Sequence, residues 1–131
     1  MTRVVDASVV VSALIATDAR ARWAEEQLVG DSLVAPHLLP LEVANVLRRS
    51  VRTGLVPQEI AGLALDDLVD LSITYYEVVP HLSRIWALRD NLSAYDAAYV
   101  ALAEALDAPL ATLDRRLAGA AGSRCDFRVP D

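Results

Sequence analysis

The sequence predicts an α/β fold in which a parallel sheet is flanked by helices. Short runs rich in β-branched residues alternate along the chain with longer segments of helical periodicity, and this alternation is typical of that class. The chain has 131 residues, the size of one ordinary domain, and it contains no internal repeat or long linker. We therefore expect residues 1–131 to form a single domain.

The strands of this sheet are expected at short apolar runs. They lie at 3–6, 33–35, 73–79 and 110–112, with a fifth, edge strand at 127–129. The helices are expected at 9–15, 19–29, 40–53, 57–70, 82–89 and 93–106, with a helical turn at 114–118. Pro40 suits the first turn of a helix, and Gly30 and Gly54 suit helix ends. The sheet should therefore have four or five strands.

Composition and charge narrow the class of protein. The net charge of −6 argues against a protein that coats nucleic acid through bulk positive charge, but not against a nuclease that holds cations. All twelve cationic residues are arginines, so mechanisms that need a lysine are excluded. The single cysteine, Cys125, fits a reducing cytoplasm, and no apolar stretch approaches the length of a membrane span. Hydrophobic residues make up 54% of the chain, a surplus that predicts an apolar surface for a partner.

Four carboxylates stand where the expected strands end or the helices that follow them begin. Asp6 ends the first strand, and Asp114 follows the fourth. Glu42 and Asp96 each lie in the first turn of a helix. In an open parallel sheet the carboxyl ends of the strands share one edge, where ligands gather. We therefore expect all four acids to meet there.

Each acid also has an ordinary structural explanation. Asp6 and Asp114 can cap the helices that follow them, and Asp96 lies three residues after Ser93, as in a capping box. A lone Glu42 on a polar helix face is usually just solvated. The setting of Asp96 favours a function, because residues 97–103 are almost wholly apolar and an acid at a buried edge needs a partner or a metal.

Together, the four acids predict a metal centre. Close carboxylates repel one another by ~4 kcal/mol per pair at an intermediate dielectric. No lysine is available to neutralise them, His37 and His81 lie outside these segments, and no spacing suggests zinc. A hard divalent cation with oxygen ligands, Mg²⁺ or Mn²⁺, is the simplest remedy.

Four segments in register, 4–8, 42–47, 92–99 and 110–114, resemble the PIN-domain family, and more narrowly the VapC-type toxins of bacterial toxin–antitoxin pairs. The resemblance covers nearly the whole chain. It implies a three-layer fold and Mg²⁺- or Mn²⁺-dependent endoribonuclease activity on RNA. It also implies homodimerisation and neutralisation by a cognate VapB-like antitoxin.

Residue by residue, the resemblance implies that Asp6, Glu42, Asp96 and Asp114 form the catalytic, metal-binding quartet. It implies that Ser8, Asn45 and Thr112 are supporting polar neighbours. Asp6, Asp96 and Asp114 would hold the ion, while Glu42 would bind a second ion or orient the attacking water. Candidate contacts to RNA phosphates are Arg48, Arg49, Arg115 and Arg116. Many relatives carry a further acid where Arg115 and Arg116 stand, which argues against a complete second metal site.

The same residues argue against two other enzyme classes. A phosphoacceptor domain would need a lysine, and a phosphatase with an aspartate nucleophile would need an acid where Ser8 stands. A catalytically degenerate PIN-like domain that only binds protein or RNA remains as the alternative. For the partner, Trp23, Leu28 and Leu63 are candidates to line a groove for an antitoxin helix, unless they are ordinary core residues. An arginine from the antitoxin would then replace the metal in neutralising the acids.

Overall fold

The computed structural model describes residues 1–131 and has the expected α/β architecture. Its elements are β1 (Thr2–Val5), α1 (Ala7–Ile15), α2 (Ala19–Gln27), β2 (Ser32–Pro36), α3 (Leu39–Arg52), α4 (Gln58–Asp70), β3 (Ile73–Tyr76), the 3₁₀ turn η1 (Val79–His81), α5 (Leu82–Ala87), α6 (Ala94–Leu106), β4 (Leu110–Ala111), α7 (Arg115–Ala118) and β5 (Phe127–Arg128). No helix combines the length and apolar character that crossing a membrane requires.

The five strands form one fully parallel sheet in the order β3-β2-β1-β4-β5. The central strand is β1, in which Val4 faces Val34 of β2 on one side and Leu110 of β4 on the other. The chain builds outward from β1 to β3 and then crosses back to place β4 against β1. The order reverses between β1 and β4, and ligands bind beyond the carboxyl ends of strands at such a point.

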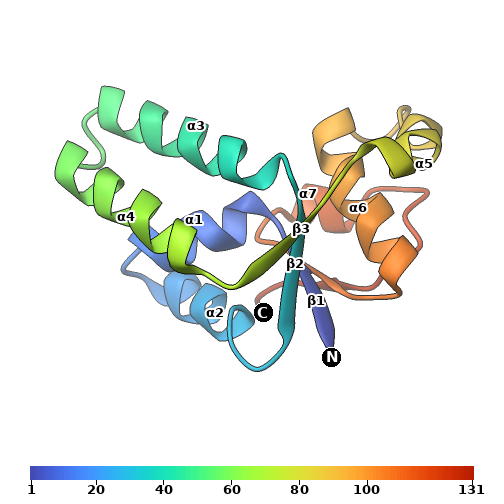
Figure 1. The fold of residues 1–131 in the computed structure, drawn as a ribbon, viewed down its shortest axis with the longest axis horizontal. Coiled ribbons are helices and arrows are strands. Elements are labelled where there is room, and N and C mark those ends of the chain that lie inside the picture. Colours follow the sequence, from blue (N-terminus) through green and yellow to red (C-terminus); the bar gives the residue numbers. More distant parts are fainter.

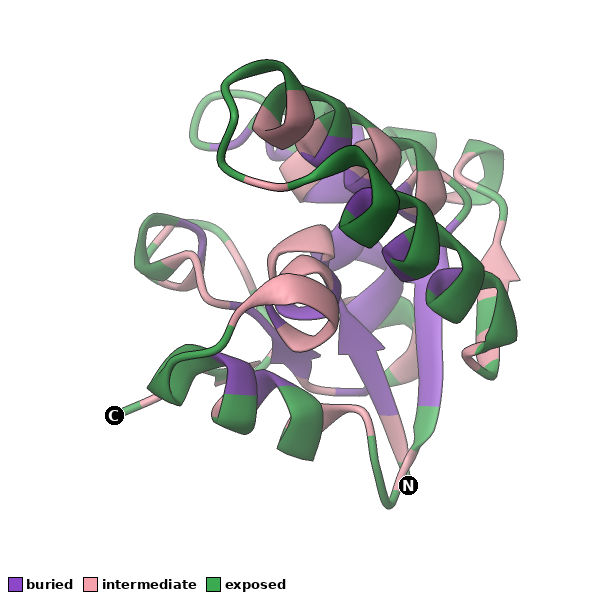
Figure 2. Cartoon of the chain, turned by 90° about the vertical axis from the view of Figure 1, so that its left-hand side faces the viewer, coloured by how far each residue is buried: buried purple, intermediate pink, exposed green.

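Helices cover both faces of the sheet, which gives three layers. Figure 1 shows α1 to α4 on one side and α5 to α7 on the other, with the carboxyl ends of the strands between α3 and α6. Helix α6 packs on β1, β2 and β4, and every residue from Ala97 to Ala103 is buried. In Figure 2 the buried strands lie beneath helices whose outer faces are exposed. The burial expected for residues 97–103 is confirmed.

Several element bounds differ from those expected, by one to three residues. The first strand ends at Val5, because the Asp6 side chain accepts a hydrogen bond from the Val9 backbone and so begins α1. The third strand ends at Tyr76 instead of 79, and Pro80, which has no N–H for a strand ladder, lies in the 3₁₀ turn. The fifth, edge strand is confirmed at Phe127–Arg128.

Candidate active site

Asp6 is the most buried of the four acids, with only 6% of its surface exposed. Its Oδ1 accepts hydrogen bonds from the Ser8 hydroxyl at 2.6 Å and the Val9 backbone at 3.2 Å. Its Oδ2 accepts from the Thr112 hydroxyl at 2.5 Å. The capping explanation and the functional one are therefore both compatible with this residue. The three donors hold the carboxylate in one orientation at the end of β1.

Glu42 lies half-buried in the first turn of α3. Its Oε1 accepts a hydrogen bond of 2.5 Å from the hydroxyl of Tyr99, a residue of α6 that is only 2% exposed. Glu42 is therefore not a solvated surface residue. The Tyr99 hydroxyl joins α3 to α6 across the edge of the sheet and fixes the carboxylate there.

Asp96 and Asp114 share one cation, the guanidinium of Arg116. Its Nη2 donates to Asp96 Oδ2 at 2.8 Å and to Asp114 Oδ2 at 3.1 Å. Ser93 caps α6 through the Asp96 backbone, and Asp114 caps α7 through the Arg116 and Leu117 backbones. The sequence contains no lysine to neutralise the acids, but in the structure an arginine, Arg116 of α7, pairs with two of them.

The supporting polar residues divide into two kinds. Thr112 is fully buried, and besides donating to Asp6 it accepts a hydrogen bond from the Asp114 backbone at 3.0 Å. Ser8 likewise donates to Asp6 and accepts from the Leu113 backbone at 3.0 Å. These two hydroxyls tie Asp6 to the segment that carries Asp114. Asn45, by contrast, is exposed and lines a hollow beside Glu42.

The other candidate arginines lie apart from the acids. Arg115 turns toward the C-terminus, where it donates to the Pro130 carbonyl. Arg48 and Arg49 are exposed on α3, and Arg48 lines a separate hollow between α3 and α4. Of the four arginines expected to contact phosphate, Arg116 alone is within hydrogen-bonding distance of the acids.

Burial and mutual repulsion shape the charge of the centre. Burial is the main reason that the pKa of Asp6 lies above its usual value, and the nearby charge of Asp96 raises it further. The pKa of Glu42 is also raised, first by burial and then by the charges of Asp96 and Asp6, although the Tyr99 hydrogen bond lowers it. The paired carboxylates raise the pKa of Arg116. Asp6, Glu42 and Asp96 are thus close enough to repel one another.

The donor set fits a hard divalent cation. The centre offers carboxylate oxygens and hydroxyls and no sulfur or imidazole, which is the ligand chemistry of Mg²⁺ and Mn²⁺. Arg116 stands in for a cation between two of the carboxylates. No group of three or more acidic, histidine or cysteine side chains converges tightly enough here to hold an ion. Binding an ion at Asp96 and Asp114 therefore requires Arg116 to move away from them.

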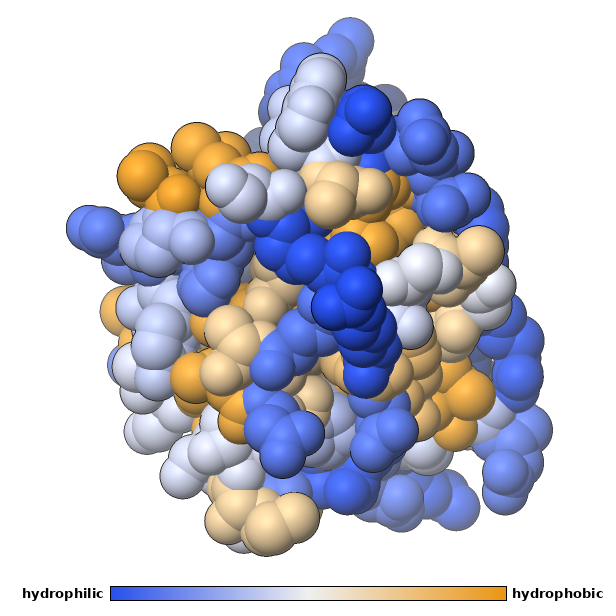
Figure 3. Space-filling model, turned by 90° about the vertical axis from the view of Figure 1, so that its right-hand side faces the viewer, coloured by the Kyte–Doolittle hydropathy of each residue, from blue (hydrophilic) through white to orange (hydrophobic).

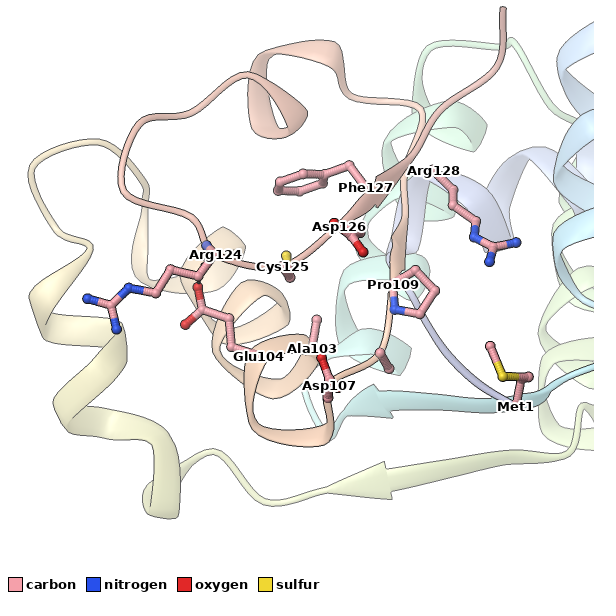
Figure 4. A pocket seen from close by; sticks show the side chains of 11 residues that line it. Met1, Ala103, Glu104, Asp107, Pro109, Arg124, Cys125, Asp126, Phe127 and Arg128 are labelled. Atoms are coloured by element: carbon pink, nitrogen blue, oxygen red, sulfur yellow. Dashed lines mark hydrogen bonds between the residues drawn. The ribbon is translucent and has the colours of Figure 1, made fainter.

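Three hollows flank the acids. One, of about 540 Å³, is lined by residues of α1 with Val46, Leu113 and Asp114, and another, also of about 540 Å³, by Glu42, Asn45, Tyr95 and two leucines. The third, of about 710 Å³, is lined by Asp114 with residues of α2 and the C-terminus. A separate hollow of about 660 Å³ is lined mainly by the C-terminal part of α6 and the segments around β4 and β5 (Figure 4). There Glu104 is already paired with Arg84 and the Arg124 backbone, so this hollow is separate from the acidic centre.

This arrangement is that of a nuclease-type α/β domain with carboxylates beyond the switch point of a parallel sheet. The PIN domain profile matches residues 3–123, and the chain belongs to that family. It is 45% identical over 127 residues to Ribonuclease VapC1 of Mycobacterium tuberculosis, covering 96% of each chain.

Solved structures share the fold at lower identity. PAE2754 from Pyrobaculum aerophilum matches with a TM-score of 0.71 and 24% identity, over 97% of this chain and 83% of that one. VapBC2 from Rickettsia felis, solved bound to a DNA fragment from its promoter, matches with a TM-score of 0.71 and 14% identity over 100% of both chains.

Sequence reasoning missed two residues that hold the acids. Tyr99 stands within an apolar run that hides its hydroxyl's role, although it follows Asp96 by three residues and so shares its side of α6. The position of Arg116 suits a phosphate contact. It stands two residues after Asp114, but its reach to Asp96, 20 residues earlier, depends on how α6 and α7 pack.

Proposed function

We propose that this protein is a metal-dependent endoribonuclease, the toxin component of a type II toxin–antitoxin system, built as one domain over residues 1–131. The proposal is supported by the electrostatic coupling of Asp6, Glu42 and Asp96 at the carboxyl edge of the sheet and by the ion pairs through which Arg116 links Asp96 to Asp114. Each of the four acids comes from a different segment of a chain that matches a VapC ribonuclease at 45% identity. Two of these carboxyls, those of Asp6 and Glu42, accept hydrogen bonds from the hydroxyls of the buried residues Thr112 and Tyr99.

Each residue has a distinct part in this proposal. A bound Mg²⁺ or Mn²⁺ would polarise the scissile phosphate and make its bound water a better nucleophile. Asp6, Asp96 and Asp114 would hold the ion, and Glu42 would bind a second ion or orient the attacking water. Ser8 and Thr112 keep Asp6 oriented toward the centre, while Tyr99 does the same for Glu42. Arg116, once displaced from the carboxylates, is placed to contact a phosphate oxygen.

The test is cleavage of total RNA by the purified protein with Mg²⁺, with Mn²⁺ and with EDTA. We expect cleavage with either ion and none with EDTA. Asp96→Asn should abolish cleavage and largely remove the rise in melting temperature that the ion causes, because a ligand that binds only the folded state stabilises it. Asp66→Asn, at an exposed position on α4, is the matched control.

Asp6→Asn should also abolish cleavage, but it is the less clean variant because Asp6 accepts three hydrogen bonds. Wild-type cleavage by Asp96→Asn would contradict the proposed centre. Folded protein that binds RNA but cuts none with either ion would favour the alternative, a degenerate PIN-like domain that acts as a binding module.

We further propose a VapB-like antitoxin as partner, and a homodimer. Large apolar side chains are exposed along α3 and α4 and the loop between them: Leu41, Leu55, Ile60, Leu63 and Val69. The expected groove needs revision, because Trp23 and Leu28 are half-buried and pack against the core, whereas Leu63 is 61% exposed on α4. Figure 3 shows apolar patches also on the opposite side of the molecule, interrupted by strongly hydrophilic side chains.

The partner proposal is tested by expressing this chain alone and together with the product of an adjacent small gene. We expect growth arrest alone, rescue on co-expression, and a complex on size exclusion. Harmless expression with no complex would contradict the toxin assignment and leave the nuclease proposal standing by itself.

A further inference from the structure

One of the hollows beside the acids has a lining unlike that of the centre itself. It measures about 540 Å³ and is lined by Leu38, Leu41, Glu42, Asn45 and Tyr95. Glu42 belongs to both the hollow and the centre, since its carboxyl is electrostatically coupled to Asp6 and Asp96. The hollow therefore opens directly beside the carboxylates.

The side chains of this hollow are free to meet a ligand. Tyr95 is 65% exposed and Leu41 75% exposed, and Asn45 is also exposed. Tyr95 is the second residue of α6 and directly precedes Asp96, so the first turn of that helix sets its position relative to the acids. By contrast Tyr99, one turn later, is buried and already bonded to Glu42. Tyr95 therefore lines the hollow, whereas Tyr99 holds Glu42 from the interior.

The charge of the side chains that line this hollow favours a nucleobase over a phosphate. Its only charged side chain is Glu42, and no arginine lines it. A phosphate would be repelled there, whereas a neutral, planar group would not. An aromatic face offers stacking, leucines offer an apolar floor, and the Asn45 amide offers both a donor and an acceptor to a base edge.

We propose that this hollow is a nucleobase subsite, which takes an unpaired base of the RNA next to the scissile phosphate. The base stacks on Tyr95 and its edge is read by Asn45. A base held in a helical duplex cannot reach this position, so the subsite takes a base that is unpaired. This inference rests on the proposed ribonuclease function and adds a base-binding subsite to it.

An apolar side chain of a protein partner is the competing occupant. The base is favoured because the lining joins a stacking surface to a hydrogen-bonding amide directly beside the reacting centre. An apolar side chain would leave the amide of Asn45 unused. The two occupants can be distinguished by changing Tyr95. The change weakens binding of RNA if the occupant is a base, and binding of the partner protein if the occupant is an apolar side chain.

The experiment measures binding and cleavage of short single-stranded RNA by the full-length protein. Binding is followed by fluorescence anisotropy in EDTA, with a labelled 10-mer and with versions that carry one abasic site at each position in turn. Tyr95→Ala should weaken binding by about 5- to 150-fold, the range for losing one base stack. Tyr95→Phe should bind as wild type, and Trp86→Ala, at another exposed aromatic on α5, is the matched control.

The decisive result is a coupling between the tyrosine and one base. An abasic site at one position should weaken binding to the wild type and have little further effect on Tyr95→Ala. With Mn²⁺ present, Tyr95→Ala should raise KM for the 10-mer more than it lowers kcat, and Asn45→Ala should alter the preference among bases.

Equal binding by wild type and Tyr95→Ala, or equal abasic penalties in both, would overturn the subsite. So would a variant that binds RNA normally but loses the antitoxin, because the hollow would then belong to the protein partner. A wild-type protein that neither binds nor cuts RNA would overturn the proposed function itself. A protein that cuts RNA regardless of residue 95 would overturn the subsite alone.

Discussion

The hydroxyl of Thr112 offers a direct test of how the buried acid is held. Thr112→Val keeps the shape of the side chain but removes both its donor to Asp6 and its acceptor for the Asp114 backbone. Thr112 is fully buried and Asp6 nearly so. A hydrogen bond to a charged group contributes about 1.5–3 kcal/mol, so we expect the free energy of unfolding at pH 8 to fall by about 2–3 kcal/mol.

The effect should depend on pH. Without the Thr112 donor, the pKa of Asp6, already raised by burial, rises further. The folded variant therefore disfavours the ionised carboxylate more than the wild type does. The destabilisation should be fully present above the raised folded pKa and should shrink as acid protonates Asp6.

Urea unfolding of both proteins across this pH range measures the effect. Thr74→Val, the same change at an exposed position of β3, is the control and should stay within about 0.5 kcal/mol of wild type. A Thr112→Val protein as stable as that control at pH 8 would refute the stabilising role of the Thr112 hydroxyl. A destabilisation that does not change with pH would refute its link to the ionisation of Asp6.

Three further predictions concern the same centre. Arg116→Gln removes the cation that competes for Asp96 and Asp114, so calorimetry should show Mn²⁺ binding tighter by about two- to fivefold, and weaker binding would mean that Arg116 assists the ion. Tyr99→Phe keeps the ring but removes the donor to Glu42; we expect a loss of about 1–2 kcal/mol in urea unfolding and a cleavage–pH profile shifted upward, and an unshifted profile would count against Glu42. Because burial raises the pKa values of Asp6 and Glu42 above 3.8 and 4.5, the metal-free protein should lose stability as pH rises from those values through the folded ones; thermal melts at several pH values measure this, and a melting temperature that does not fall over the range would refute the raised pKa values.

Much of the fold could be predicted from local patterns. The alternation of β-branched runs with helical segments predicted the parallel sheet, and the edge strand at its end is confirmed at Phe127–Arg128. The predicted end of a strand or start of a helix was less exact where it depends on the hydrogen bond of a single side chain. Asp6 reads equally well as a strand end or a helix cap, and only the position of the Val9 backbone shows that it begins α1.

The partner surface was harder to predict. A large apolar residue such as Trp23 or Leu63 fits a core or a surface equally well, because periodicity shows that a face is apolar and not what covers it. In the structure, Trp23 packs against the core and Leu63 stays exposed. The placement depends on how α2 and α4 lie against α1, which no local pattern specifies.

The sequence by itself determined the class of fold, and it predicted that the four acids lie at the carboxyl edge of the sheet, because strand periodicity and the position of an acid after a strand are short-range properties. Only the tertiary structure decided how those acids are held. The bond from Tyr99 to Glu42 joins residues 57 apart, and that from Thr112 to Asp6 joins residues 106 apart. Arg116 reaches Asp96 only because α7 folds back beside the start of α6. Hydrogen bonds and ion pairs act over about 3 Å, so they exist only once packing has brought distant segments within that range.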